Sequence, residues 1–123
     1  MEGRKPKMSN EWMKVALCSE IREGRARLCR VGQHAVCLYN VGGTVYATDD
    51  LCTHGRASLA DGFLEGDEIV CPLHEGRFCV RTGRATGAPC TVDVKSYSVM
   101  VKEGAVLLNC TEFVDAPSGQ PLP

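Results

Sequence analysis

The sequence predicts an all-β protein, an antiparallel sandwich or barrel-like base, and three observations lead to this prediction. Short runs rich in Val, Leu and Tyr alternate with turn residues along most of the chain. The pairs Gly42-Gly43 and Glu103-Gly104 each separate two such runs, as a hairpin turn does. Helix signals are scarce. Many short strands at regular spacing favour a sandwich or barrel over a mixed fold.

The strands are predicted, in chain order, where β-branched and aromatic residues gather between turns. The expected strands are 27–31, 35–39, 44–48, 68–70, 77–80, 98–101 and 105–108. A turn is expected at Thr82-Gly83, after the fifth of these strands. One helical turn over 18–23, with Ser19 as its cap, is the only helix that the sequence suggests.

A chain of 123 residues fits one domain with its own core, which we place at 11–110. Residues 1–10 are polar and basic, and 111–123 end in a segment rich in Pro, Gly and Ser. We expect both ends to be flexible.

Two short motifs carry metal-ligand chemistry. Cys52-Thr53-His54 and Cys71-Pro72-Leu73-His74 each supply one thiolate and one imidazole, with sixteen residues between His54 and Cys71. A Rieske [2Fe–2S] centre uses two Cys and two His, and a structural zinc site is the alternative for the same four donors. Zinc modules usually keep the Cys pair and the His pair apart, whereas loops that mix them suit a two-iron cluster. We therefore expect 52–90 to be an inserted cluster-binding subdomain.

From Trp12 to Asn109 the chain resembles the Rieske ferredoxins of multicomponent aromatic-ring-hydroxylating dioxygenases, the naphthalene type above all. The likeness is carried by Cys52-Thr53-His54-Gly55 and by the run from Cys71 to Phe78. It implies that Cys52 and Cys71 bind the buried iron, that His54 and His74 bind the outer iron, and that Gly87-Ala88-Pro89 forms a loop covering the cluster.

Several flanking residues predict the character of the centre. High-potential Rieske proteins resemble C-T-H-x-G-C and C-P-C-H-G-S-x-Y, with a disulfide between the loops and two hydroxyl donors to sulfur. Here Ala57 and Leu73 stand in place of the disulfide cysteines, and Gly76 and Phe78 in place of Ser and Tyr. Fewer hydrogen bonds to sulfur predict the low end of the Rieske range. We also expect Gly55 and Gly76 to allow close backbone approach and positive φ.

Composition and charge bear on the partners, the cellular location and the remaining His and Cys residues. The net charge of −1 gives no support for nucleic-acid binding. No apolar run is long enough for a membrane span, and the N-terminus lacks the apolar core of a signal peptide, so we expect a cytoplasmic protein. His34 is not expected to be a ligand. The six further cysteines are expected to be small buried hydrophobes, with Cys79 the one to examine for oxidation or closeness to the cluster.

Together these features predict a monomeric one-electron carrier with no catalytic residues. The family resemblance implies that a flavin-containing NAD(P)H reductase reduces it and that a terminal Rieske non-haem-iron oxygenase oxidises it. No Gly-rich phosphate loop is present, so NAD or flavin would belong to the partner. The alternatives are a Rieske small subunit of a nitrite reductase or other multisubunit oxidoreductase, and a zinc-stabilised interaction module.

Overall fold

Three antiparallel sheets make up the structure, a computed structural model that describes residues 11–53, 55–73 and 75–113. The terminal sheet has the order β1 (Trp12–Leu17), β11 (Ala105–Asn109), β10 (Val99–Lys102). The central sheet has the order β2 (Ala26–Val31), β3 (His34–Val41), β4 (Thr44–Asp49), β9 (Ser96–Tyr97). The small sheet has the order β5 (Phe63–Glu65), β6 (Glu68–Val70), β7 (Arg77–Cys79), β8 (Ala85–Gly87).

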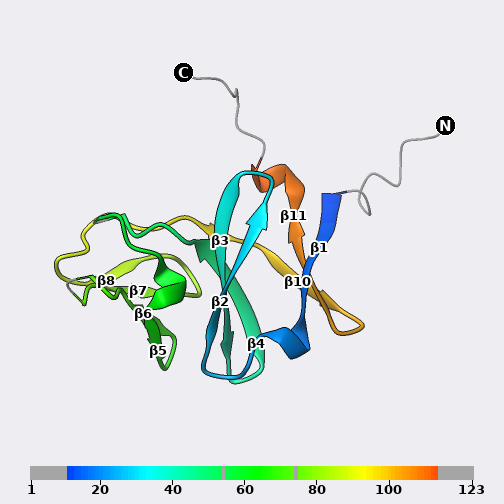
Figure 1. Ribbon diagram of the computed structural model, residues 1–123, viewed down its shortest axis with the longest axis horizontal. Coiled ribbons are helices and arrows are strands. Elements are labelled where there is room, and N and C mark those ends of the chain that lie inside the picture. The colour runs from blue at the N-terminus through cyan, green and yellow to red at the C-terminus, as the bar shows by residue number, and fades with distance from the viewer. Residues whose placement is uncertain (1–10, 54, 74, 114–123) are drawn as a thin grey trace, which may run out of the picture.

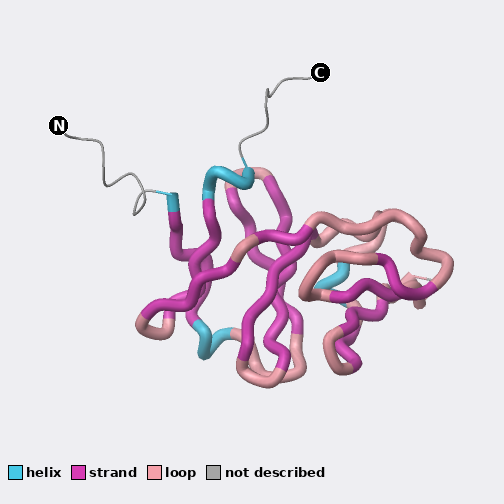
Figure 2. Tube along the Cα trace, turned by 180° about the vertical axis from the view of Figure 1, so that it is seen from behind, coloured by secondary structure: helices cyan, strands magenta, loops and turns pink. Residues whose placement is uncertain are grey.

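The central sheet lies between the other two, with the small sheet on one side and the terminal sheet on the other (Figure 1). The tube seen from behind shows the same arrangement and how little helix there is (Figure 2). The helical elements with described bounds are three short 3₁₀ turns, η1 (Cys18–Glu20), η2 (Leu59–Asp61) and η3 (Cys110–Phe113). The predicted all-β class, with an inserted subdomain on a sandwich-like base, is confirmed.

Strand β3 explains how one central sheet serves two cores. Successive side chains of a strand point to opposite faces. Val36 and Leu38 accordingly belong to the core shared with the terminal sheet, whereas Cys37 and Tyr39 belong to the core under the small sheet. All four are fully buried, so β3 reads as a continuous apolar run, as a strand covered on both faces should.

Hairpin turns fix the register of the neighbouring strands. Gly42 and Gly43, at φ 60 and 94, join β3 to β4. Glu103 and Gly104, at φ 53 and 80, join β10 to β11. Two consecutive positive φ values are the mark of a type I′ turn, whose twist matches that of the strands. Both predicted hairpins are confirmed.

The strand predictions succeeded for β2, β3, β4, β6, β7, β10 and β11, with ends displaced by one or two residues at most. The predicted helical turn is the 3₁₀ turn η1, which stops at Glu20. The predicted flexible ends, 1–10 and 111–123, fall outside the described residues except for 111–113, which belong to η3. Phe113 stacks on Tyr97, with ring centroids 4.3 Å apart.

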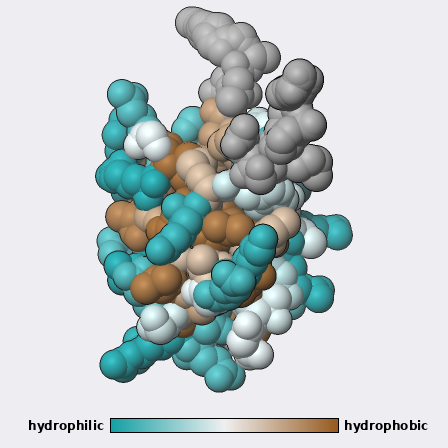
Figure 3. Space-filling model, turned by 90° about the vertical axis from the view of Figure 1, so that its right-hand side faces the viewer, coloured by the Kyte–Doolittle hydropathy of each residue, from teal (hydrophilic) through white to brown (hydrophobic). Residues whose placement is uncertain are grey.

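The face of the terminal sheet is mixed in character. Figure 3, which views this side, shows apolar patches interrupted by hydrophilic side chains. Leu17 and Val101 are exposed apolar residues on its strands, and Lys14 and Lys102 on the same strands are exposed as well. Lysines on edge strands such as β1 and β10 discourage pairing with other chains. Within the described ranges, no helix has the length and apolar character needed to cross a membrane.

Candidate metal centre

The first predicted ligand loop follows β4 and is closed by its own backbone. The amide of Cys52 donates to the carbonyl of Ala57 at 2.9 Å. Outside that bond, Leu51 pairs with Ser58 in an isolated antiparallel bridge. The amide of Leu59 donates to the carbonyl of Asp50 at 2.7 Å, which fixes the base of the loop.

The second loop follows β6 and repeats this design. The amide of Cys71 donates to the carbonyl of Gly76 at 2.7 Å, so each cysteine amide bonds the fifth residue after it. The amide of Glu75 also donates to the carbonyl of Cys71, at 3.1 Å, and Glu75 adopts φ 63. A cysteine thus stands at the base of each loop. His54 and His74 belong to these loops but lie outside the described residues.

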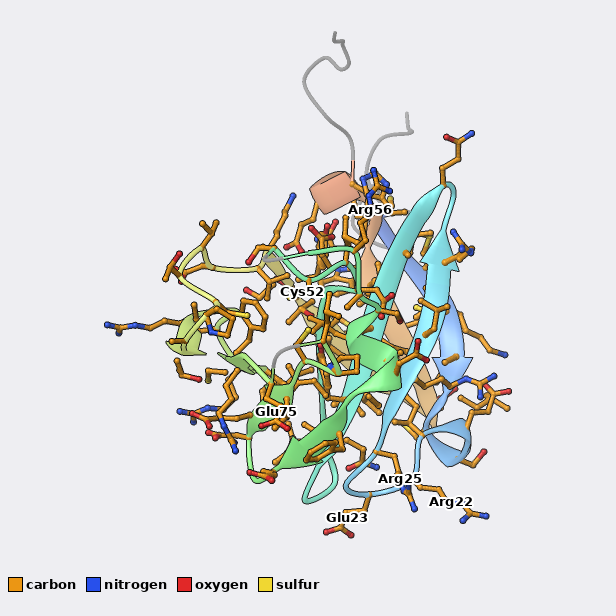
Figure 4. All side chains as sticks on the ribbon, turned by 60° about the vertical axis from the view of Figure 1, so that its left-hand side comes forward. Arg22, Glu23, Arg25, Cys52, Arg56 and Glu75 are labelled. Carbon is orange, nitrogen blue, oxygen red and sulfur yellow. The ribbon has the colours of Figure 1, made fainter. Side chains whose placement is uncertain are left out.

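The two cysteine side chains lie together inside the molecule. Cys52 is 2% exposed and Cys71 is 1% exposed, and both belong to the core under the small sheet. Figure 4 shows Cys52 near the centre of the view and Glu75 below it on the second ligand loop, where its side chain is exposed. Burial, followed by an interaction with the Cys52 thiol, raises the pKa of Cys71.

This donor set fits the inner half of a two-iron centre. Two buried thiols that interact with each other are positioned to bind one metal ion together, and iron stabilises the thiolate that burial alone disfavours. Among the described residues no group of three or more His, Cys, Asp or Glu side chains forms a metal site, and two of the four predicted ligands lie outside that set.

A third loop, after β8, covers the first. The hydroxyl of Thr53 donates to the carbonyl of Val92 at 2.5 Å, and the amide of Cys90 donates to the carbonyl of Gly87 at 3.1 Å. The Ala88-Pro89 peptide in this loop is cis. The loop that the resemblance pointed to therefore lies against the first ligand loop.

Cys90 is the residue that the sequence prediction placed in the core without linking it to the site. Its Sγ lies 3.8 Å from the Sγ of Cys52, and the residue is 4% exposed. Burial, followed by the neighbouring Cys52, raises the pKa of Cys90 to about 12. The one signal in the sequence was its place directly after Pro89.

Two glycines let the loops approach closely. A Cβ on Gly55 would lie 3.1 Å from the Cδ2 of Leu73, so the two ligand loops touch there. A Cβ on Gly76 would lie 2.2 Å from the Sγ of Cys90. The predicted close approach is confirmed. The prediction of positive φ is wrong at both Gly55 and Gly76. In the second loop the left-handed residue is Glu75, the neighbour of Gly76, which supplies the sharp bend instead.

Cys79 is not part of the buried group that contains Cys52, Cys71 and Cys90. It follows the buried Phe78 on β7, and its half-buried side chain points to the opposite face of the strand. Partial burial raises the pKa of Cys79, but hydrogen bonds with Thr82 and Arg81 outweigh it, and the net pKa is lowered. The thiol therefore interacts with the turn after β7.

The charged residues of the small sheet pair with one another. Arg77 contacts Glu65 at 2.7 Å and Glu68 at 3.4 Å, and Arg81 contacts Asp67 at 3.3 Å. These surface pairs contribute little stability. They do neutralise much of the negative charge that Glu65, Asp67 and Glu68 bring to this sheet.

His34 opens β3 and packs edge-on against Phe113, with ring centroids 5.5 Å apart.

Residues 11–98 match the family model described as the Rieske [2Fe-2S] domain. The chain belongs to this Rieske family. Its Rieske domain implies a [2Fe–2S] cluster as the cofactor, consistent with the buried thiols of Cys52 and Cys71.

Its relatives include ferredoxins of dioxygenase systems. The ferredoxin component of a 2,4-dinitrotoluene dioxygenase system of Burkholderia sp. is 48% identical over 82% of this chain and 97% of its own length. The ferredoxin component of the naphthalene 1,2-dioxygenase system of Pseudomonas aeruginosa is 47% identical over 83% of this chain and 98% of its own length. The predicted family resemblance is confirmed.

Solved structures agree. A chain in the complex of reduced oxygenase and oxidized ferredoxin of carbazole 1,9a-dioxygenase superposes with a TM-score of 0.76 at 46% identity, over 81% of this chain and 94% of the other. A nitrite reductase NADPH small subunit superposes with a TM-score of 0.69 at 18% identity, over 79% of this chain and 96% of the other, a likeness of fold alone.

Proposed function

We propose that this protein is the ferredoxin of an aromatic-ring-hydroxylating dioxygenase system, a one-electron carrier rather than an enzyme. The observation that carries the proposal is the pair of matched loops that bury Cys52 and Cys71 side by side in a Rieske chain. The ferredoxin components of the dinitrotoluene and naphthalene systems, which match over most of this chain, support it.

In this proposal Cys52 and Cys71 hold the inner iron, and His54 and His74 hold the outer one. Burial of the two thiols suits the inner position, because anionic ligands need a metal charge where water is excluded. The cluster supplies the ability to accept and release one electron. The protein's own part is to keep the thiols dry and to hold the loops in place.

We place the reduction potential at the low end of the Rieske range, which runs from about −150 to about +300 mV. Ala57 and Leu73 occupy the positions of the disulfide cysteines, so no disulfide between these positions ties the ligand loops together. Phe78, at the position where high-potential relatives place Tyr, is fully buried and has no hydroxyl to donate. Gly76, at the position where those relatives place Ser, likewise has no hydroxyl to donate.

The partners in this proposal are a flavin-containing NAD(P)H reductase and a terminal Rieske non-haem-iron oxygenase. A ferredoxin and an oxygenase form a complex in the carbazole 1,9a-dioxygenase structure, which supports the second partner. We place the carrier in the cytoplasm as a monomer, with neither nucleic acid nor membrane among its partners. The aromatic substrate is decided by the oxygenase chain.

The two alternatives are less well supported. The small subunit of a nitrite reductase shares the fold at 18% identity, whereas the dinitrotoluene and naphthalene ferredoxins match at 45–48%. A zinc module would use the same four donors, but the family match is to an iron–sulfur domain.

The test of the carrier role is electron transfer between purified components. The protein is mixed anaerobically with NADH and the reductase of a naphthalene dioxygenase system, and bleaching of its visible spectrum is followed. Adding that system's oxidised oxygenase should restore the colour of the ferredoxin. Failure of reduction by this reductase and by the reductases of the dinitrotoluene and carbazole systems, in protein that dithionite does reduce, would contradict the role.

A further inference from the structure

The thiol of Cys90 lies next to a sulfur that is predicted to bind iron. Its Sγ is 3.8 Å from the Sγ of Cys52, within the range of a hydrogen bond between sulfur atoms. Cys90 comes from the loop after β8, whereas Cys52 and Cys71 come from the two ligand loops. All three belong to one buried group of side chains.

Hydrogen bonds and close packing with neighbouring loops fix the position of Cys90. Its amide donates to the carbonyl of Gly87 at 3.1 Å, and the loop is tied to the first ligand loop by the bond from Thr53 to Val92. The backbone of Gly76 faces its sulfur so closely that a Cβ there would lie at 2.2 Å. A side chain held in this way, at 4% exposure, keeps a fixed relation to the Cys52 sulfur.

We propose that the S–H of Cys90 donates a hydrogen bond to the Sγ of Cys52 when Cys52 binds iron. Cys90 is then a positioning residue that favours the reduced protein. The inference rests on the proposed function only through the role of Cys52 as a ligand.

The direction of the hydrogen bond follows from the chemistry of the ligand. Between two free thiols either sulfur can donate. A metal ligand is a thiolate, which has lone pairs but no proton. The proton must therefore come from Cys90, the other sulfur of the pair, which is not among the predicted iron ligands.

The effect on the potential also has a definite sign. Reduction adds an electron and makes the ligand sulfurs more negative, and hydrogen bonds to charged acceptors are stronger than neutral ones. A donor on Cys52 thus stabilises the reduced form more than the oxidised form and raises the potential. Gly76 and Phe78 lack the hydroxyl donors of the high-potential relatives, so the thiol of Cys90 offsets part of their effect.

The experiment compares holoprotein variants by redox titration. Cys90→Ala should lower the equilibrium constant for reduction by threefold or more, a midpoint shift of about −28 mV when tenfold corresponds to about 59 mV for one electron. Cys90→Ser keeps a donor and should stay at or above the wild-type potential. Cys37→Ala is the matched control, because Cys37 is fully buried and its thiol faces the carbonyl of Leu38 instead.

A second measurement decides the matter even if Cys90→Ala fails to load iron. The S–H stretching band of Cys90 is identified in wild-type holoprotein as the band that is missing in Cys90→Ser. We expect this band to move to lower frequency on reduction, because its acceptor becomes more negative. A band that does not move, or equal potentials for wild type and Cys90→Ala, would overturn the inference. A Rieske signal in the same wild-type sample would leave the proposed function standing, and its absence would remove both.

Discussion

The substitution Gly76→Ala tests how the second ligand loop and the third loop pack. Gly76 is buried, and its carbonyl accepts the amide of Cys71. An added methyl group would lie 2.2 Å from the Sγ of Cys90 and 3.1 Å from its Cβ. Since Gly76 does not have a positive φ, the expected cost comes from this collision and not from the backbone conformation.

The magnitude follows from the overlap. Carbon atoms in contact are usually about 3.5 to 4.0 Å apart, so the sulfur or the loop must move by more than about 1 Å. Overpacking of this kind costs about 1–3 kcal/mol. For a domain near 100 residues each kcal/mol lowers Tm by about 4–8 °C, which predicts a fall of about 4–24 °C.

The assay is thermal unfolding of the holoprotein, followed by circular dichroism, for wild type, Gly76→Ala, Cys90→Ala and the double variant. Removing the Cys90 sulfur should relieve much of the collision, so the double variant should lose less than the sum of the single losses. Gly66→Ala is the control: its site is open, at φ +65, so any loss there comes from backbone strain and is independent of Cys90. An unchanged Tm for Gly76→Ala, or strictly additive losses with Cys90→Ala, would refute the packing described here.

Three further predictions concern the core, the ligands and the half-buried thiol of Cys79. Phe78→Ala should cost about 3–5 kcal/mol because its side chain is fully buried, whereas Phe63→Ala, at a position 57% exposed, should cost far less in the same urea titration. His74→Ala should abolish the Rieske spectrum while Cys79→Ser retains it; a normal spectrum in the first variant would remove His74 from the ligand set. Iodoacetamide at pH 8 should label Cys79 before Cys29, because only the thiolate reacts, the pKa of Cys79 is lowered and burial raises that of Cys29 to about 11; mass spectrometry showing the reverse order would contradict the pKa difference.

The sequence was a good guide where local pattern decides structure. The two type I′ hairpins need residues that tolerate positive φ, and Gly42, Gly43 and Gly104 made them visible. The spacing of Cys52 and Cys71 with their histidines predicted a metal centre with no further information. Metal-ligand residue types at a characteristic spacing can be recognised from the sequence alone.

It was a poor guide where distant segments decide structure. β1, which was not predicted, pairs with β11 at the other end of the chain. β5, β8 and β9 were also missed, because strands of two or three residues show little alternation of their own. Cys90 looked like any small apolar residue until the third loop placed it beside Cys52. Its closeness depends on contacts between loops 38 residues apart, which no local pattern records.

The measurement that tests the central claim most directly is electron paramagnetic resonance of dithionite-reduced protein, with iron, sulfide and zinc assayed in the same sample. A Rieske centre bound by Cys52, His54, Cys71 and His74 predicts two irons per chain and a rhombic signal with an average g below that of an all-thiolate [2Fe–2S] cluster. Zinc without a signal, in protein prepared anaerobically, would contradict the claim and leave a zinc-stabilised module.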